Sequence, residues 1–178
     1  KIKKDRSNFE AFKSLMIPYF KEIDLHYPEN EPTSAEDTIK YAENMLAKQD
    51  AEDSYLELCY EKNKLIGFLY AKIDHKGQPD CNKPEYGFIA EFYVAPKFRR
   101  KDHGKEMFFH IERLFAKHNV KRMYLNADKV TGEPFWSALG FKFCGEISSE
   151  NEQKIYEKDV SYYNEAFRQT VSDIRVNI

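Results

Sequence analysis

Residues 91–104 read Glu-Phe-Tyr-Val-Ala-Pro-Lys-Phe-Arg-Arg-Lys-Asp-His-Gly, and the rest of the chain is arranged around them. The segment predicts a hydrophobic strand that Pro96 ends, a turn with three consecutive cations, and a helix that begins near His103 or Gly104. Backbone N–H groups at a helix start have no intrahelical acceptor and carry the positive end of the helix dipole, so such a turn is suited to bind phosphate. A solvated basic turn explains this segment equally well when it is considered alone.

Two helices are predicted before this segment. Apolar residues three or four apart predict a helix from Ser7, where Ser7 and Glu10 form a capping box. Prolines interrupt the chain at 27–32 and predict a loop. Thr33 and Glu36 form a second capping box, which predicts that a second helix begins there.

Strands are predicted between these helices and the central segment. The residues at 54–60 and 65–74 favour strands and flank a short turn, which indicates an antiparallel hairpin. Gly67 inside the second strand indicates a bulge or a close approach of another backbone. The polar segment at 75–84 predicts an exposed loop that leads into the central strand at 86–94.

A helix, a strand and a short helix are predicted after the turn. The first helix is amphipathic and runs to about Asn119, and the strand at 121–126 then pairs in parallel with 86–94 through a right-handed crossover. Residues 131–134 open a short helix that Gly140 ends in a left-handed conformation. The last predicted elements are an antiparallel strand pair at 141–147 and 154–160 and a tail helix at 161–178.

Length and composition restrict the class of protein. A chain of 178 residues fits one domain, which we place at 1–160, followed by the tail. The formal charge of −2 gives no general electrostatic reason to bind nucleic acid or a membrane. The three cysteines have neither zinc nor disulfide spacing, and the chain contains no apolar run of membrane-spanning or signal-peptide type, so we expect a cytoplasmic protein without a metal.

Two motifs, read together, point to a family. Residues 99–104 read Arg-Arg-Lys-Asp-His-Gly, and residues 135–141 read Phe-Trp-Ser-Ala-Leu-Gly-Phe. They resemble the turn (Arg or Gln, two residues, Gly, one residue, then Gly or Ala) and the Phe-Tyr-x-x-x-Gly-Phe segment of the GNAT superfamily of acetyl-CoA-dependent N-acetyltransferases. The resemblance covers roughly residues 7–160. It implies an α+β, GNAT-like fold, in which helices flank a mixed, mostly antiparallel central sheet with a splayed parallel pair.

The same resemblance implies an acetyl-CoA site along residues 92–105. Backbone groups of the strand would pair with the pantetheine amides as an added strand does, and the turn would hold the pyrophosphate through its N–H groups. The residues assigned to the cofactor on this ground are Phe92, Tyr93, Val94, Arg99, Arg100, Lys101, Asp102, His103, Gly104, Lys105 and Trp136.

Two of these residues depart from the family pattern. Asp102 stands where the family has its first Gly, so its side chain is expected to crowd and repel the phosphates and to weaken cofactor binding. Trp136 stands where many members have a Tyr that protonates the leaving thiolate, and an indole donates a hydrogen bond without giving up a proton.

Acetyl transfer to an amine requires a base, because an amine with a pKa of about 10.4 costs roughly 4–5 kcal/mol to deprotonate at pH 7. Glu91 is the candidate base, and a carboxylate paired with a neighbouring cation or strand N–H explains it equally well. Tyr93 and Tyr124 are candidate replacement acids, each at least as well explained as a core aromatic residue. A strand N–H near Val94 is the expected hydrogen-bond donor to the thioester carbonyl.

The leading hypothesis is therefore transfer of an acetyl group from acetyl-CoA to a primary amine in a ternary complex. A groove between the N-terminal helices and the C-terminal strand pair would hold the amine. Carboxylates around the two helices favour a small cationic acceptor, although solvated surface is the more common explanation: Glu22, Asp24, Glu29, Glu31, Glu36 and Asp37. The alternative is a non-catalytic acyl-CoA-binding or regulatory domain, which Asp102 and Trp136 motivate. A nucleic-acid binder conflicts with the net charge, and the aromatic tail suggests a homodimer.

Overall fold

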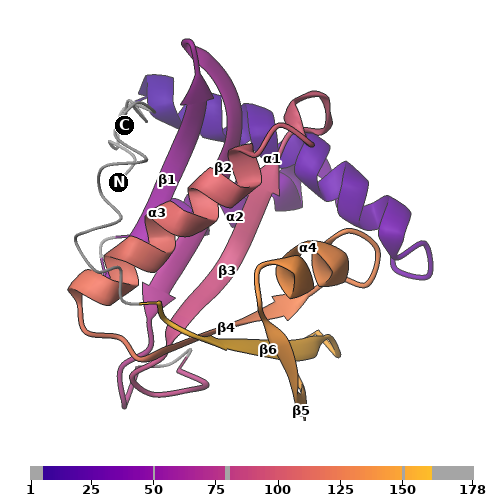
Figure 1. The fold of residues 1–178 in the computed structure, drawn as a ribbon. Coiled ribbons are helices and arrows are strands. Elements are labelled where there is room, and N and C mark those ends of the chain that lie inside the picture. The colour runs from indigo at the N-terminus through magenta and orange to yellow at the C-terminus, as the bar shows by residue number, and fades with distance from the viewer. Residues whose placement is uncertain (1–5, 50, 79–80, 150, 162–178) are drawn as a thin grey trace. The chain divides into compact units, whose positions relative to one another are not determined.

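The computed structural model describes residues 6–49, 51–78, 81–149 and 151–161. The strands form one six-stranded sheet in the order β1-β2-β3-β4-β6-β5 (Figure 1). The elements, in chain order, are α1 (Arg6–His26), α2 (Ala35–Lys48), β1 (Ser54–Glu61), β2 (Lys64–Ile73), β3 (Gly87–Val94), the 3-10 turn η1 (Pro96–Phe98), α3 (His103–Lys117), β4 (Arg122–Ala127), α4 (Gly132–Ala138), β5 (Lys142–Ile147) and β6 (Lys154–Asp159).

The sheet is mixed, as the sequence predicts. Strand β3 pairs with β4 in parallel, with Gly87 opposite Met123. Strand β6 pairs antiparallel with both β4 and β5, with Leu125 opposite Tyr156 in the first pair. The predicted α+β class and the parallel pair are therefore confirmed.

The chain forms two compact units. Unit 1 comprises the described residues up to Tyr70 together with Glu91–Gly104, and unit 2 comprises Ala71–Ala90 and the described residues from Lys105 onward. The extent of the domain, 1–160, stays a prediction. The predicted tail helix at 161–178 lies, except for Ser161, outside the described residues.

The two helix starts differ from the predicted capping boxes. Helix α1 already includes Arg6, so Ser7 lies inside it. Helix α2 is capped by Ser34, whose hydroxyl accepts a hydrogen bond of 3.0 Å from the N–H of Asp37. Thr33, one residue earlier, instead donates to the Asp24 carboxylate from its N–H (3.1 Å) and from its hydroxyl (3.0 Å). The loop between the two helices is thereby fixed to the end of α1.

Aromatic packing holds α1 against β2 in unit 1. The rings of Phe12 and Phe68, both fully buried, meet edge to face with centroids 5.2 Å apart. Gly67 confirms the expected close approach, because a Cβ there would lie 2.2 Å from the carbonyl oxygen of Tyr93. Beside this contact, the N–H of Ala95 donates a hydrogen bond of 2.8 Å to the carbonyl of Ile66. The end of β3 therefore lies close against β2.

Unit 2 has its own apolar core. Helix α3 buries one face, and Phe115 lies so close to Gly87 that a Cβ there would be 2.5 Å from its ring. Gly140 has φ of 92° and follows α4, as predicted for a left-handed helix end. The described residues contain no helix of the length and apolarity needed to cross a membrane.

Candidate active site

The carboxylate of Glu91 is held by two tyrosine hydroxyls. Tyr19 of α1 donates a hydrogen bond to Oε2, and Tyr41 of α2 donates one to Oε1. Glu91 and Tyr93 are two residues apart on β3, so the pleat places both on one side of the strand. Both contact Tyr19, because the rings of Tyr19 and Tyr93 also meet with centroids 5.4 Å apart. The partners of Glu91 are thus hydroxyl groups.

The surroundings of Glu91 change its acidity. Burial raises the pKa of Glu91, the hydrogen bonds from Tyr19 and Tyr41 lower it, and the net pKa lies above the ordinary value. A carboxylate with a raised pKa binds a proton more strongly than an exposed one. Glu91 is therefore better suited than a surface glutamate to accept a proton from an amine near neutral pH.

Tyr93 is a buried tyrosine beside this carboxylate. Its side chain is 3% exposed, and its hydroxyl has no hydrogen-bond partner among the described residues. Burial raises the pKa of Tyr93, the Glu22 carboxylate raises it further, and the Arg99 guanidinium lowers it. An unpaired buried hydroxyl costs about 1–3 kcal/mol. A ligand that hydrogen-bonds to this hydroxyl would remove that cost.

Arg99 faces the protein and fixes the turn to α1. Its two terminal nitrogens lie 2.7 Å from the two carboxylate oxygens of Glu22, and its Nε donates to the carbonyl of Val94 at 2.7 Å. The guanidinium also lies over the Tyr93 ring, 5.6 Å from its centroid. The side chain of Arg99 therefore supports the turn, while the backbone of the following residues remains available to a ligand.

The basic turn, residues 97–104, has an unusual backbone. Arg100 and Asp102 have φ of 60° and 61°, in the left-handed region that favours glycine. In the part of the chain that the structure describes, the N–H groups of Arg100, Lys101 and Asp102 donate to no protein acceptor. They are followed by the first turn of α3, where the positive end of the helix dipole lies. Unpaired N–H groups at and before a helix start are suited to bind an anion.

The cations at the turn have different surroundings. The ammonium groups of Lys97 and Lys101 lie over the buried Phe98 ring, 5.1 and 5.8 Å from its centroid. The Nε2 of His103 lies 3.4 Å from a carboxylate oxygen of Glu61 on β1. The lysines thus add positive charge beside the unpaired N–H groups.

The predicted site residues Tyr124 and Trp136 belong to unit 2, whereas Glu91, Tyr93 and residues 97–104 belong to unit 1. The Tyr124 hydroxyl donates to Oδ2 of Asp74 at 2.6 Å. Burial and this carboxylate raise the pKa of Tyr124 far above its ordinary value. Trp136 is 6% exposed and packs between Phe108 and Phe141, with ring centroids 6.1 and 5.3 Å away. Lys105, at the start of unit 2, places its ammonium 5.8 Å from the centroid of Phe109.

Two functional candidates, Tyr19 and Tyr41, are not apparent from the sequence, and neither is the pairing of Glu22 with Arg99. Tyr19 follows the apolar spacing of α1 and reads as a core residue, and Tyr41 lies one residue before the buried Ala42 of α2. A weak signal exists for one pair, because Tyr19 and Glu22 are three apart and therefore share a helix face. Nothing in the sequence pairs that face with Glu91 and Arg99.

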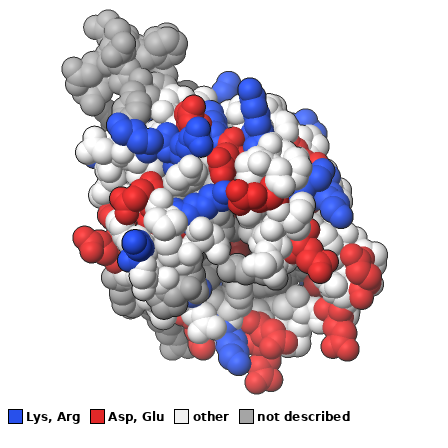
Figure 2. Space-filling view, turned by 90° about the horizontal axis from the view of Figure 1, so that it is seen from below, with Lys and Arg blue, Asp and Glu red and all other residues white. Residues whose placement is uncertain are grey.

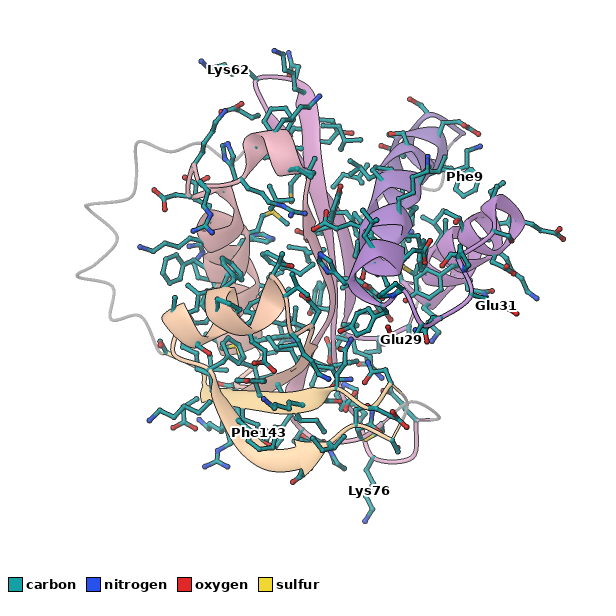
Figure 3. The ribbon with its side chains drawn as sticks, turned by 90° about the vertical axis from the view of Figure 1, so that its right-hand side faces the viewer. Phe9, Glu29, Glu31, Lys62, Lys76 and Phe143 are labelled. Atoms are coloured by element: carbon teal, nitrogen blue, oxygen red, sulfur yellow. The ribbon has the colours of Figure 1, made fainter. Side chains whose placement is uncertain are left out.

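The acidic residues around the helices separate into two groups. Glu22, Asp24 and Asp37 are engaged by Arg99, Thr33 and Ser34 within unit 1. Glu29, Glu31 and Glu36 are exposed, and Figure 3 shows the first two at the connection between α1 and α2. On the face shown in Figure 2, acidic and basic side chains are intermixed and no continuous basic field appears.

One group of potential metal ligands lies in unit 2. Ligand atoms of Cys144, Glu146 and Glu157 lie within 4.8 Å of one another. The ammonium of Lys83 is 2.9 Å from the carboxylate of Glu146 and 2.7 Å from that of Glu157. Both carboxylates therefore already have a cation as partner.

Comparisons with known proteins bear on this geometry. The chain resembles the PaiA N-acetyltransferase from Thermoplasma acidophilum solved with coenzyme A (18% identity, TM-score 0.64, covering 86% of this chain and 93% of that one). It also resembles a GNAT-family acetyltransferase from Staphylococcus aureus Mu50 (13% identity, TM-score 0.61, covering 90% of this chain and 98% of that one). A third similar structure is an aminoglycoside 6′-N-acetyltransferase complexed with coenzyme A (13% identity, TM-score 0.61, covering 91% of this chain and 96% of that one). These likenesses show the fold.

The sequence was also compared with curated proteins and with sequence models of protein families. A comparison with curated proteins found no match. The sequence model of the acetyltransferase (GNAT) family matches residues 10–141, which include Glu91, the basic turn and Trp136. The chain therefore belongs to the acetyltransferase (GNAT) family and is an N-acetyltransferase that depends on acetyl-CoA.

Proposed function

We propose that this enzyme acetylates the primary amine of a small cationic molecule by direct attack in a ternary complex, with Glu91 as the base. The observation that carries the proposal is the partly buried carboxylate of Glu91, whose pKa is raised and whose position both N-terminal helices fix. Tyr93 and the basic turn belong to the same unit as this carboxylate.

The donor side of the site uses backbone groups more than side chains. The unpaired N–H groups of Arg100 to Asp102 suit a pyrophosphate, with Lys97 and Lys101 adding charge. Phe92 to Val94 would pair with the pantetheine arm, and a strand N–H near Val94 would donate to the thioester carbonyl oxygen. These residues fit coenzyme A, although Asp102 opposes its charge.

The chemistry assigns two protons to named groups. Glu91 removes a proton from the bound ammonium, and the neutral nitrogen attacks the thioester carbon. The carbon–sulfur bond then breaks, Tyr93 donates its hydroxyl proton to the thiolate, and the second proton of the nitrogen returns to Tyr93. Of the candidate acids, Tyr93 is favoured for the thiolate, because the hydroxyl of Tyr124 already donates to Asp74. Each turnover releases one proton to the solvent.

The cationic acceptor is inferred from charge. Glu29, Glu31 and Glu36 are exposed on and beside the loop that joins α1 to α2, the same helices that hold Glu91. Carboxylates there would attract a polyamine or an aminoglycoside and repel an anionic amine. The likeness to an aminoglycoside acetyltransferase is in keeping with such an acceptor.

The test measures free thiol released from acetyl-CoA with a panel of polyamines, aminoglycosides and anionic amino compounds. We expect turnover with cationic amines, and a higher KM with little change in kcat when Glu29 and Glu31 are both changed to Gln. Preference for an anionic or neutral amine would contradict the proposed acceptor class. Tight binding of coenzyme A without turnover on any amine would support an acyl-CoA sensor instead.

A further inference from the structure

The hydrogen bonds of Glu91 lead in two different directions. Tyr19 is enclosed by aromatic rings, with the centroids of Phe20, Phe68 and Tyr93 each 5.4 Å from its own. Tyr41 contacts the ring of Phe20 at 5.2 Å, and its side chain is 37% exposed. One hydroxyl thus holds the carboxylate from inside unit 1, and the other joins it to the surface.

We propose that the Tyr41 hydroxyl is the route by which Glu91 returns its proton to the solvent, while Tyr19 positions the carboxylate. The proposal rests on the proposed role of Glu91 as base. It assigns different functions to two tyrosines that make the same kind of hydrogen bond to the same side chain.

Glu91 needs a route for its proton because the proposed reaction leaves one on the carboxylate. The acceptor arrives as an ammonium ion, so every turnover leaves a proton on Glu91. Burial favours the protonated carboxyl group, which therefore regains its charge slowly unless a neighbouring group accepts the proton. The groups described as facing Glu91 and Tyr41 are the tyrosines Tyr19 from α1, Tyr70 from β2 and Tyr93 from β3, with the Glu22–Arg99 pair beside Tyr93.

The step conserves protons and charge. The proton on Oε1 of Glu91 moves to the oxygen of Tyr41 as the hydroxyl proton of Tyr41 moves to a water or buffer base. Tyr41 is neutral before and after the step, and its new hydroxyl again donates to the carboxylate. No tyrosinate accumulates, which agrees with the strongly raised pKa of Tyr41, caused by burial and by Glu91.

The test compares Tyr41→Phe with Tyr19→Phe in dilute buffer. Each variant removes one hydrogen bond that stabilises the charged carboxylate, so the acidic limb of the kcat/KM profile should move to higher pH in both. Only Tyr41→Phe should also lose kcat by roughly 100-fold, the lower end of the range for a proton-transfer group. Added imidazole should restore the kcat of Tyr41→Phe in proportion to its concentration and leave Tyr19→Phe unchanged.

Two further variants complete the experiment. Tyr60→Phe removes a hydroxyl from another exposed tyrosine, 41% exposed on β1, and should behave as the wild type. Tyr41→His supplies a group that can carry a proton, so it should retain turnover without imidazole even if Tyr41→Phe folds poorly.

The outcomes separate this proposal from the proposed function. Two results would overturn the proton route: wild-type kcat in Tyr41→Phe at low buffer, or an equal loss of kcat in Tyr19→Phe with no rescue of either variant. In both cases an inactive Glu91→Gln would still support Glu91 as the base. Full turnover of Glu91→Gln would remove both the base and the route.

Discussion

Asp102 occupies a backbone conformation that suits the glycine found there in the family. A φ of 61° costs a residue with a Cβ about 1–2 kcal/mol, and Asp is among the residues that tolerate it. The strain is present with or without ligand, so it lowers stability, whereas the negative charge beside the proposed phosphate site should lower affinity. The two effects are therefore separable by mutation.

Changing Asp102 tests this separation. Asp102→Asn and Asp102→Gly should both strengthen coenzyme A binding about five-fold at low salt, close to 1 kcal/mol, with a smaller gain at high salt. Asp102→Gly should in addition raise the free energy of unfolding above that of Asp102→Asn. Titration calorimetry and urea unfolding measure the two quantities. Unchanged affinity in Asp102→Asn would show that the carboxylate does not oppose the phosphates.

Glu91→Gln tests the same residue in catalysis and in folding. Turnover should fall about 10²-fold to 10⁴-fold with similar coenzyme A affinity. The pKa of Glu91 is raised in the folded state, so the folded wild type binds more protons and loses stability as pH rises from about 4 toward neutral. The unfolding free energy of Glu91→Gln relative to wild type should therefore increase over that range. A difference that does not vary with pH would contradict the raised pKa.

Single residues were predictable where a motif fixes their position. Glu91 and Asp102 follow from the strand and the turn, but Tyr19 and Tyr41 do not, because an aromatic residue on a helix face reads as core. Their role depends on which strand the helix covers, and helical periodicity carries no such information.

At the scale of elements, α1 and the basic turn are joined by the ion pair of Glu22 and Arg99. Both side chains are partly buried, 20% and 32% exposed, and the contact is bidentate. Hydrogen bonds between charged groups in such settings are stronger than exposed ion pairs. The turn therefore depends on a helix that lies about 77 residues earlier in the chain.

Glu22→Gln should lower the free energy of unfolding by about 1–2 kcal/mol and weaken coenzyme A binding, because the turn loses its anchor. Glu10→Gln is the matched control on the same helix: its carboxylate is 53% exposed and pairs with Lys13, so its loss should cost less than about 0.5 kcal/mol. Equal effects of the two changes on stability and binding would exclude a supporting role for Glu22.

The boundaries of elements show where sequence patterns are ambiguous. Thr33 with Glu36 and Ser34 with Asp37 both place a hydroxyl residue three positions before an acid, so either could cap α2. The structure uses Ser34 because Asp24 accepts both donors of Thr33. This choice depends on a carboxylate of the preceding helix, which local capping rules do not include.

For the whole molecule, coenzyme A should act as a stabilising ligand. Binding at 100 times Kd adds about 2.7 kcal/mol, which for a chain of this size raises Tm by about 5–10 °C. Pantetheine lacks the pyrophosphate and should give a much smaller shift at equal concentration. Differential scanning fluorimetry measures both, and equal shifts would show that the turn contributes little to binding.

The sheet and helices of the described residues were predictable because strand-turn-helix-strand order and two separated motifs agree with one another. The acceptor was not, because its recognition depends on loops and side chains that the family motifs do not specify. The proposed preference for a cationic acceptor rests on exposed carboxylates, which carry no information on the shape of the acceptor.

The ion pair of Glu22 and Arg99 has a thermodynamic consequence. Helix α1 carries Tyr19 and Glu22 on one face, so the helix that positions the proposed base also anchors the turn. If either ligand changes the strength of that ion pair on binding, the affinities for donor and acceptor become linked. Linkage is reciprocal: the factor by which coenzyme A alters acceptor affinity must equal the factor by which the acceptor alters coenzyme A affinity. In Glu22→Gln both factors should approach one together.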